Sequence, residues 1–354
     1  MDTMKLLYPA STSEKPAPGR LKMADIAKLA GVSVSTVSRA LAGSPLIPQA
    51  QREKIEAIAR GQGYVVNAAA RNLRTRTTQT IGIVLPMGHE TGQAMTDPFL
   101  LEMIGHLSEE VIHRGYDILL TKISAPKEGW LNALIQSHRF DGMLMIGQSD
   151  QHAAIEGASK TYAPVVVWGE RLPGQQYTSV GLDNVLGGRL AAEHLLALGR
   201  RQIRFLGPVG VPEVDSRYRG YLQAMAEGAE AAGDVAQIDC RFTQASAYQT
   251  VLGLIDGGAH FDALFCASDV IASGARDALA ERGRSIPDDV ALCGFDDVAM
   301  ARGMAPPLTT VRQDLAEAGR VMVDTLFRKL KGENPPSVFI PARLIVREST
   351  IGKG

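Results

Sequence analysis

The stretch DIAKLAGVSVSTVSRAL, residues 25–41, decides how the start of this chain folds. Apolar residues recur at helical spacing on both sides of Gly31, which predicts two short helices joined by a turn. Two such helices cross at a steep angle only where the residues at the crossing are small, as Ala27 and Ala30 are. Gly31 can adopt the left-handed conformation of such a turn, and Ser33 is a good N-cap for the second helix. The pattern is typical of a helix-turn-helix.

The second of these helices is expected to present a polar and basic surface. We expect it to turn Val37 and Leu41 toward the core and to expose Val34, Ser35, Ser38 and Arg39. Short hydroxyl side chains let a helix N-terminus approach a DNA groove closely, and an arginine can donate two hydrogen bonds to guanine or bind phosphate. The alternative for this motif alone is an ordinary helix pair with a glycine turn.

The charge of the chain is unevenly distributed. The net charge is −1 over 354 residues, but residues 20–80 hold ten basic and three acidic side chains, a net of +7. Residues 1–19 are neutral overall, so the rest of the chain carries −8. A basic end on an acidic body suits a protein that brings one end to DNA phosphates. For charge alone, a solvated basic face is the alternative.

From residue 80 onward, short apolar runs alternate with helical segments. The expected strands are IGIVLP, YDILL, DGMLMIG, APVVVWG, IRFLGP, ALFCAS and VALCGF. The helical segments between them include residues 99–114, 184–198, 216–232 and 270–282. This alternation predicts an α/β fold of parallel sheets flanked by helices, and the length favours two open sheets over one. The predicted domains are a disordered arm over 1–20, an all-α helix-turn-helix head over 21–66, a hinge helix or linker over 67–79, and a two-lobed core over 80–354.

Several spaced motifs resemble those of one family in the same order. They are ADIAKLAGVSVSTVSRAL, NAAARNLRTRTTQTIGIVLP, VGLDNVLGGRLAAEHLLALGRRQIRFLGP, RGYLQAM, CASDVIASGA, IPDDVALCGFDD and LIVREST. Together they resemble the LacI/GalR family of transcription regulators over about residues 21–351. The resemblance implies a periplasmic-binding-protein-like core that senses a small molecule, and a homodimer that binds pseudo-palindromic operator DNA.

The resemblance also implies roles for residues of the head and linker. Val34, Ser35 and Arg39 would contact base edges, Thr36 and Ser38 would hold the DNA backbone, and Asn67 would begin a hinge helix in which Leu73 enters the minor groove. Without it, Leu73 would be a plain linker residue. The chain departs from the family at Lys22 and Pro48, where helix-capping hydroxyls are usual, and at Ala42 and Val66, where asparagine and proline are frequent.

Polar and aromatic residues gather where the predicted strands end. Ligands of two-lobed α/β proteins bind at the carboxyl ends of strands. Asp97 and Phe99 follow the first strand, Arg217 opens the helix after IRFLGP, and Ser268 and Asp296 end two later strands. With Phe242, these side chains could hold a polyol. The resemblance supports them as cleft residues, with Trp168 and Asp183 as neighbours.

Each of these residues has a simpler interpretation. Asp296 could cap a helix, Phe242 and Trp168 could be core, and Arg217 could pair with Asp215 or Glu213 at the surface. The effector is expected to be a neutral sugar or small oligosaccharide, because no second basic residue beside Arg217 favours a phosphorylated one. A purine-type corepressor is the alternative.

Two other classes of protein fit the sequence less well. A periplasmic-type sugar-binding protein would carry a signal peptide and would lack a basic helix-turn-helix head. The N-terminus shows no signal-peptide pattern, and residues 20–80 are basic. An enzyme is not expected, because no GxGxxG, P-loop or GxSxG occurs. The seven histidines and three cysteines lack metal-ligand spacing. We therefore expect no catalytic site, metal or cofactor, and a cytoplasmic protein without a membrane span. The absence of a leucine-heptad tail favours a dimer over a tetramer.

Overall fold

A computed structural model describes residues 21–64, 77–87, 93–124, 126–148, 150–228 and 237–352. The chain divides into two compact units, Met1–Arg76 and Thr77–Gly354. The predicted arm, residues 1–20, lies outside the described residues, and so do residues 65–76, which hold most of the predicted hinge.

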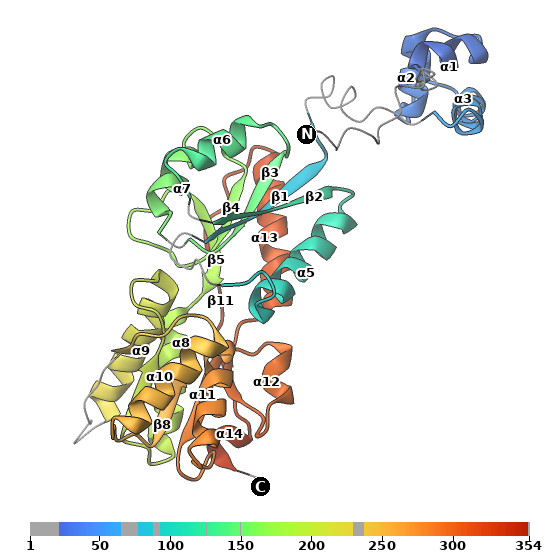
Figure 1. Cartoon of the computed structure of the whole chain (residues 1–354). Coiled ribbons are helices and arrows are strands. Elements are labelled where there is room, and N and C mark those ends of the chain that lie inside the picture. The colour runs from blue at the N-terminus through green and yellow to red at the C-terminus, as the bar shows by residue number, and fades with distance from the viewer. Residues whose placement is uncertain are drawn as a thin grey trace, which may run out of the picture. The chain divides into compact units, whose positions relative to one another are not determined.

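The first unit is a small helical head (Figure 1). Its helices are α1 (Met23–Ala30), α2 (Val34–Leu41) and α3 (Gln49–Gly61). Ile26, Val37 and Ile55, one from each helix, are at most 1% exposed and form the centre of its core. The helix-turn-helix prediction is confirmed in detail: Gly31 has a φ of +69°, and Ser33 Oγ accepts a hydrogen bond from Thr36 N at 3.1 Å.

The second unit consists of two lobes, each built on a six-stranded sheet of described residues. The first sheet is entirely parallel. Its order is β11 (Val338–Ile340), β5 (Thr178–Leu182), β4 (Val165–Trp168), β3 (Gly142–Ile146), β1 (Thr80–Met87) and β2 (Asp117–Ser124). Its helices are α5 (Pro98–His113), α6 (Trp130–Gln136), α7 (His152–Ser159) and α13 (Leu315–Leu330).

Alternation along β1 explains how the first sheet is covered. Ile81, Ile83 and Leu85 pack in one cluster with side chains of α5 and α13. Val84 points to the other face and packs with Leu131 of α6. Both faces are therefore buried, as the nearly continuous apolar run of this strand predicts for a central parallel strand.

The second lobe repeats this architecture with one antiparallel strand. Its sheet order is β12 (Arg343–Ile345), β10 (Thr309–Arg312), β9 (Ala291–Asp296), β8 (Ala263–Cys266), β6 (Ile203–Leu206) and β7 (Gln237–Ile238). Only the β12–β10 pair among these is antiparallel. The helices are α8 (Asn184–Ala197), α9 (Pro212–Gly228), α10 (Gln244–Asp256), α11 (Asp269–Glu281), α12 (Ala299–Gly303) and α14 (Glu348–Ile351). The predicted α/β class and two lobes are confirmed.

Three crossings of the chain join the lobes. They follow β5 at Asp183, β10 at residues 313–314, and β11 at residues 341–342. Parallel strands of both sheets therefore end toward the boundary between the lobes, where a ligand site is expected. Among the described residues, no helix is long and apolar enough to cross a bilayer.

Candidate functional site

The exposed surface of α2 carries most of the side chains predicted to contact DNA. Val34 is 46% exposed, and Ser35 and Arg39 are exposed as well, while Thr36 is half-buried. Because the Arg39 side chain is exposed, its guanidinium donors can reach a ligand. Asn67 and Leu73, predicted for the hinge, lie outside the described residues.

The predicted exposure of Ser38 is wrong. Its side chain is only 6% exposed. Ser38 lies next to Val37 and three residues before Leu41, both of which pack in the core of the head. The buried face of α2 is therefore wider than the apolar spacing predicts.

The two departures at helix starts have different consequences in the head. At α1, Asp25 Oδ2 accepts a hydrogen bond from Lys22 N at 2.8 Å and so satisfies one backbone donor at the helix start. At α3, Pro48 provides no side-chain cap. The expected loss of a cap therefore holds at the start of α3 and is partly offset at the start of α1.

A cavity in the second unit lies between the two lobes. It holds about 720 Å³ of empty space, part of it open to solvent. Seven of the eight predicted effector residues line it: Asp97, Phe99, Trp168, Arg217, Phe242, Ser268 and Asp296. The remaining residue, Asp183, does not; it is exposed, and its carboxylate caps α8 by accepting from Leu186 N at 2.9 Å.

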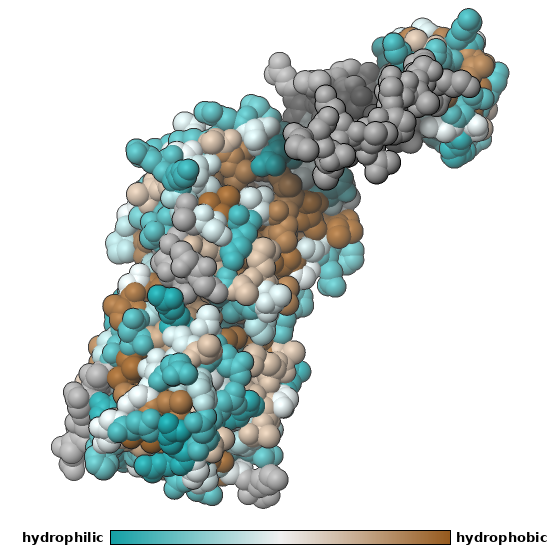
Figure 2. Space-filling model, viewed as in Figure 1, coloured by the Kyte–Doolittle hydropathy of each residue, from teal (hydrophilic) through white to brown (hydrophobic). Residues whose placement is uncertain are grey.

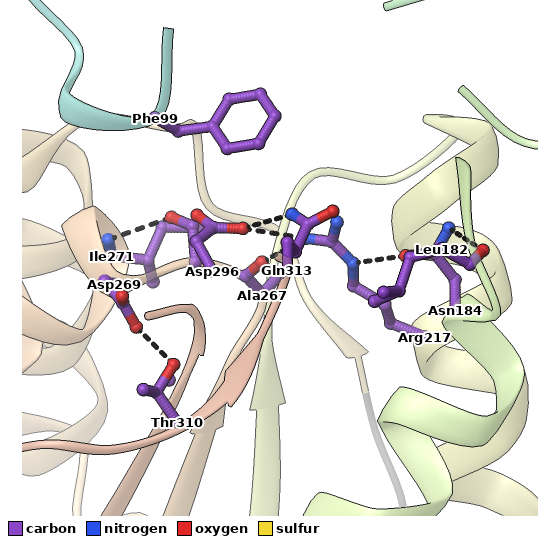
Figure 3. A network of polar contacts seen from close by, with 12 residues as sticks. Phe99, Leu182, Asn184, Arg217, Ala267, Asp269, Ile271, Asp296, Thr310 and Gln313 are labelled. Atoms are coloured by element: carbon purple, nitrogen blue, oxygen red, sulfur yellow. Dashed lines mark hydrogen bonds and ion pairs between the residues drawn. The ribbon is translucent and has the colours of Figure 1, made fainter. Parts of the chain in front are cut away.

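Arg217 and Asp296 form a buried ion pair in the wall of this cavity (Figure 3). Arg217 Nη1 lies 4.0 Å from Asp296 Oδ1 and donates to Ala267 O at 2.5 Å. The guanidinium also stacks over Phe295, with 3.7 Å from Cζ to the ring centroid. Arg217 is 6% exposed, so its alternative interpretation as a surface residue is wrong. Nor does it open a helix, since α9 begins five residues earlier, at Pro212, whose fixed φ suits a first helical position.

Asp296 and Asp297 follow β9 in an unusual backbone conformation. Their φ angles are +116° and +57°, a region that costs energy for residues with a side chain. Gln313 Nε2 holds Asp296 by donating to Oδ1 at 2.6 Å. Asp297 pairs with Arg312 and Arg347. Neither aspartate caps α12, whose N-cap is Val298, so the capping alternative for Asp296 is wrong.

Two other cavity residues combine a local structural role with access to the cavity. Asp97 caps α5, with Oδ1 accepting from Phe99 N at 3.0 Å. Ser268 Oγ accepts from Ile271 N at 3.2 Å and caps α11. A serine hydroxyl that accepts from the backbone still has a proton to donate. Both side chains are therefore held rigidly at the cavity wall.

Burial changes the protonation of the cavity carboxyls. It raises the pKa of Asp296 to about 7, against the opposing effects of Arg217 and Gln313. It also raises the pKa values of Asp97 and Glu213. A carboxyl that exchanges a proton near neutral pH can donate as well as accept hydrogen bonds, which suits a partner rich in hydroxyl groups.

Aromatic side chains line the cavity from both lobes. Phe99 and Trp168 come from the first lobe, and Phe242 from the second. In Figure 3, the Phe99 ring lies across from Asp296 and Gln313. Trp168 is 5% exposed and belongs to the core of its lobe, so its core interpretation and its place in the cavity wall are both correct.

Sequence reasoning missed four polar residues of the site. Gln93, Glu213 and Gln313 line the cavity, and Asn184 holds Arg217 from behind. Gln313 directly follows the carboxyl end of β10, and Asn184 lies two residues after β5, so the strand-end rule misses both because neither strand is recognised in the sequence.

Comparison with known proteins agrees with this geometry. A model described as bacterial regulatory proteins of the lacI family matches residues 22–67. A periplasmic binding protein-like domain matches residues 192–350. The match to the head speaks against the alternative of a sugar-binding transport protein.

Similarity extends over almost the whole chain. The ribose operon repressor of Haemophilus influenzae is 30% identical over 92% of this chain and 98% of its own length. The lac repressor dimer bound to operator and an anti-inducer superposes with a TM-score of 0.83 at 24% identity, covering 94% of this chain and 99% of that one.

A third match has a ligand in its structure. The complex of the transcriptional regulator CelR with cellobiose gives a TM-score of 0.68 at 28% identity, covering 93% of this chain and all of that one. These relatives are described as transcription regulators, not as enzymes. The chain belongs to the LacI family of bacterial regulatory proteins and is a DNA-binding transcription regulator with a ligand-binding core.

Proposed function

We propose that this regulator changes its affinity for operator DNA when a neutral sugar or small oligosaccharide binds in the interlobe cavity. The observation that carries the proposal is the cavity itself, in which aromatic faces and a buried arginine–carboxylate pair converge at the ends of strands. The protein would act in the cytoplasm, without catalysis, metal or cofactor.

The chemistry of the cavity favours a neutral polyol. Aromatic faces cover the apolar side of a sugar ring, and carboxyl, amide and guanidinium groups bond its hydroxyls. Arg217 provides the one guanidinium among the described residues that line the cavity, and it already faces Asp296. No second cation stands beside it among those residues to bind a phosphate, so a phosphorylated sugar fits poorly.

The head provides the DNA contacts in this proposal. Val34, Ser35 and Arg39 would contact base edges, and Thr36 would bind the sugar-phosphate backbone. Ser38 is only 6% exposed, so at most a small part of its side chain would contact the DNA backbone. Asn67 and Leu73 keep their proposed hinge roles on the basis of the sequence alone.

The first lobe offers a surface for the proposed homodimer. β2 is the edge strand of its sheet, and Leu101, Ile112 and Leu120 on α5 and β2 are 52%, 59% and 42% exposed. Figure 2 shows hydrophobic residues gathered over this part of the lobe. An apolar patch beside an open sheet edge is typical of a protein–protein interface. Two copies would present two heads to a pseudo-palindromic operator.

A thermal-shift screen of the purified chain tests the ligand class. The panel contains neutral sugars including cellobiose and ribose, sugar phosphates, and purines. A ligand at 100 times its dissociation constant stabilises the native state by about 2.7 kcal/mol, which raises the melting temperature measurably. A response to a neutral sugar supports the proposal. A response to purines or phosphates alone would show that the ligand class is wrong, and a purine response would favour corepression.

A further inference from the structure

The side-chain amide of Asn184 is fully used and almost fully buried. Its Oδ1 accepts from Arg217 Nε at 2.9 Å (Figure 3). Its Nδ2 donates to Glu170 Oε2 at 3.0 Å and to Leu182 O at 3.3 Å. Asn184 is 3% exposed, so water cannot readily replace these partners. The amide therefore determines where Arg217 and Glu170 lie relative to each other.

The partners of this amide belong to different lobes. Asn184 is the first residue of α8, and Arg217 lies on α9, both in the second lobe. Glu170 follows β4 in the first lobe. The hydrogen bond from Asn184 Nδ2 to the Glu170 carboxylate therefore crosses the boundary between the lobes.

We propose that Asn184 is a positioning residue that connects Arg217 of the cavity to Glu170 of the first lobe, so that effector binding at Arg217 alters the angle between the lobes. The inference rests on the proposed function, because it takes the cavity as the effector site. The first lobe is the relevant recipient, since β1 at its centre follows the linker from the DNA-binding head.

Substitutions at Asn184 and Glu170 distinguish a role of Asn184 between the lobes from a role confined to the second lobe. Asn184→Asp keeps an oxygen for Arg217 but removes the donor to Glu170 and places two carboxylates together. Glu170→Gln then restores a donor on the other side, so the double variant recovers the bond between residues 184 and 170 with reversed polarity, whereas the bond to Leu182 O stays lost. Glu170→Ala removes the acceptor of Asn184 Nδ2 without removing any hydrogen-bond partner of Arg217. Glu170→Gln alone is its matched control, because it also removes the negative charge near Arg217 but keeps an acceptor oxygen.

The experiment measures the distance between the lobes in the full-length protein by double electron–electron resonance. Nitroxide labels are placed at exposed Lys127 of the first lobe and exposed Arg284 of the second, each changed to cysteine. The native cysteines are all buried and are poor labelling sites. Neither DNA nor sugar is needed, so failure of this inference is distinguishable from failure of the ligand screen. Thermal unfolding of every variant verifies that it folds.

We expect Asn184→Asp and Glu170→Ala to lengthen or broaden the distance distribution. The Glu170→Gln variant should match wild type, and the Asn184→Asp/Glu170→Gln double variant should lie closer to wild type than Asn184→Asp alone. Arg217→Met keeps the volume of the aliphatic stem. It should also shift the distribution, because Asn184 Oδ1 loses the hydrogen bond that it accepts from Arg217 Nε. A wild-type distribution in Glu170→Ala or Arg217→Met would overturn the proposal, and so would failure of the double variant to recover. If Asn184→Asp does not fold, the Glu170→Ala and Glu170→Gln pair still decides.

Discussion

The raised pKa of Asp296 predicts how the stability of this regulator depends on pH. Burial raises it from the ordinary 3.8 to about 7. Each tenfold change in proton affinity is worth about 1.4 kcal/mol, so the difference between folded and unfolded chain corresponds to about 4 kcal/mol. The folded state binds the proton more tightly than the unfolded state does. This contribution to stability is therefore fully present below pH 3.8 and is lost as the pH rises to about 7.

The test replaces Asp296 by asparagine, which has the same shape and no proton to lose. Urea unfolding of wild type and variant is followed by circular dichroism between pH 4 and pH 8. The variant also lacks the charge that faces Arg217, but the attraction between Asp296 and Arg217 is already contained in the raised pKa of about 7. The variant should therefore gain stability relative to wild type as the pH rises from 4 toward 7, because wild type loses the contribution of the Asp296 proton over this range and asparagine has none to lose.

Asp256, an exposed carboxylate, provides the control for Asp296. Arg282 lowers the pKa of Asp256 at the surface from its ordinary 3.8, so Asp256 is ionised in the folded chain throughout the series. The free-energy difference between Asp256→Asn and wild type should therefore be nearly constant from pH 4 to pH 8. A free-energy difference between Asp296→Asn and wild type that does not vary from pH 4 to pH 6 would refute the assignment of a raised pKa to Asp296.

Three further changes test other parts of the account. Arg39→Ala should weaken operator binding by about 1–3 kcal/mol and relax one base position; an unchanged preference in a selection from random duplexes would contradict its role. Asp297→Ala leaves two arginines without their buried partner and should lower stability by about 3 kcal/mol, so an unchanged melting temperature would count against the ion pairs. Ile112→Asp should dissociate the dimer in sedimentation velocity, whereas Leu222→Asp on α9, also an exposed leucine, should not; equal behaviour of the two variants would remove α5 from the interface.

The head was the part of the fold best predicted from sequence. Gly31 and Ser33 act through local backbone chemistry, which depends on few neighbours, and both adopt the expected geometry. The exposure of Ser38 was wrong because it depends on which neighbour α2 packs against. Helical spacing alone does not determine the width of a packed face.

The strands were predicted only where they are strongly apolar. β5, β7, β10, β11 and β12 were missed, because they are two to five residues long and several are rich in threonine or charge. Cavity residues that directly follow a recognised strand, such as Asp296, were found by the rule of strand ends. Asn184 was missed because β5, the strand before it, was not recognised, and because no local pattern encodes its contact between lobes.

Control of operator binding by a small molecule can be measured in one titration. An operator duplex is first selected from random DNA with the full-length protein. Fluorescence anisotropy then measures its affinity with and without the sugar that raises the melting temperature. We predict a pseudo-palindromic site and a change in affinity of about 5- to 150-fold at saturating sugar. The same affinity with and without saturating sugar would contradict the account.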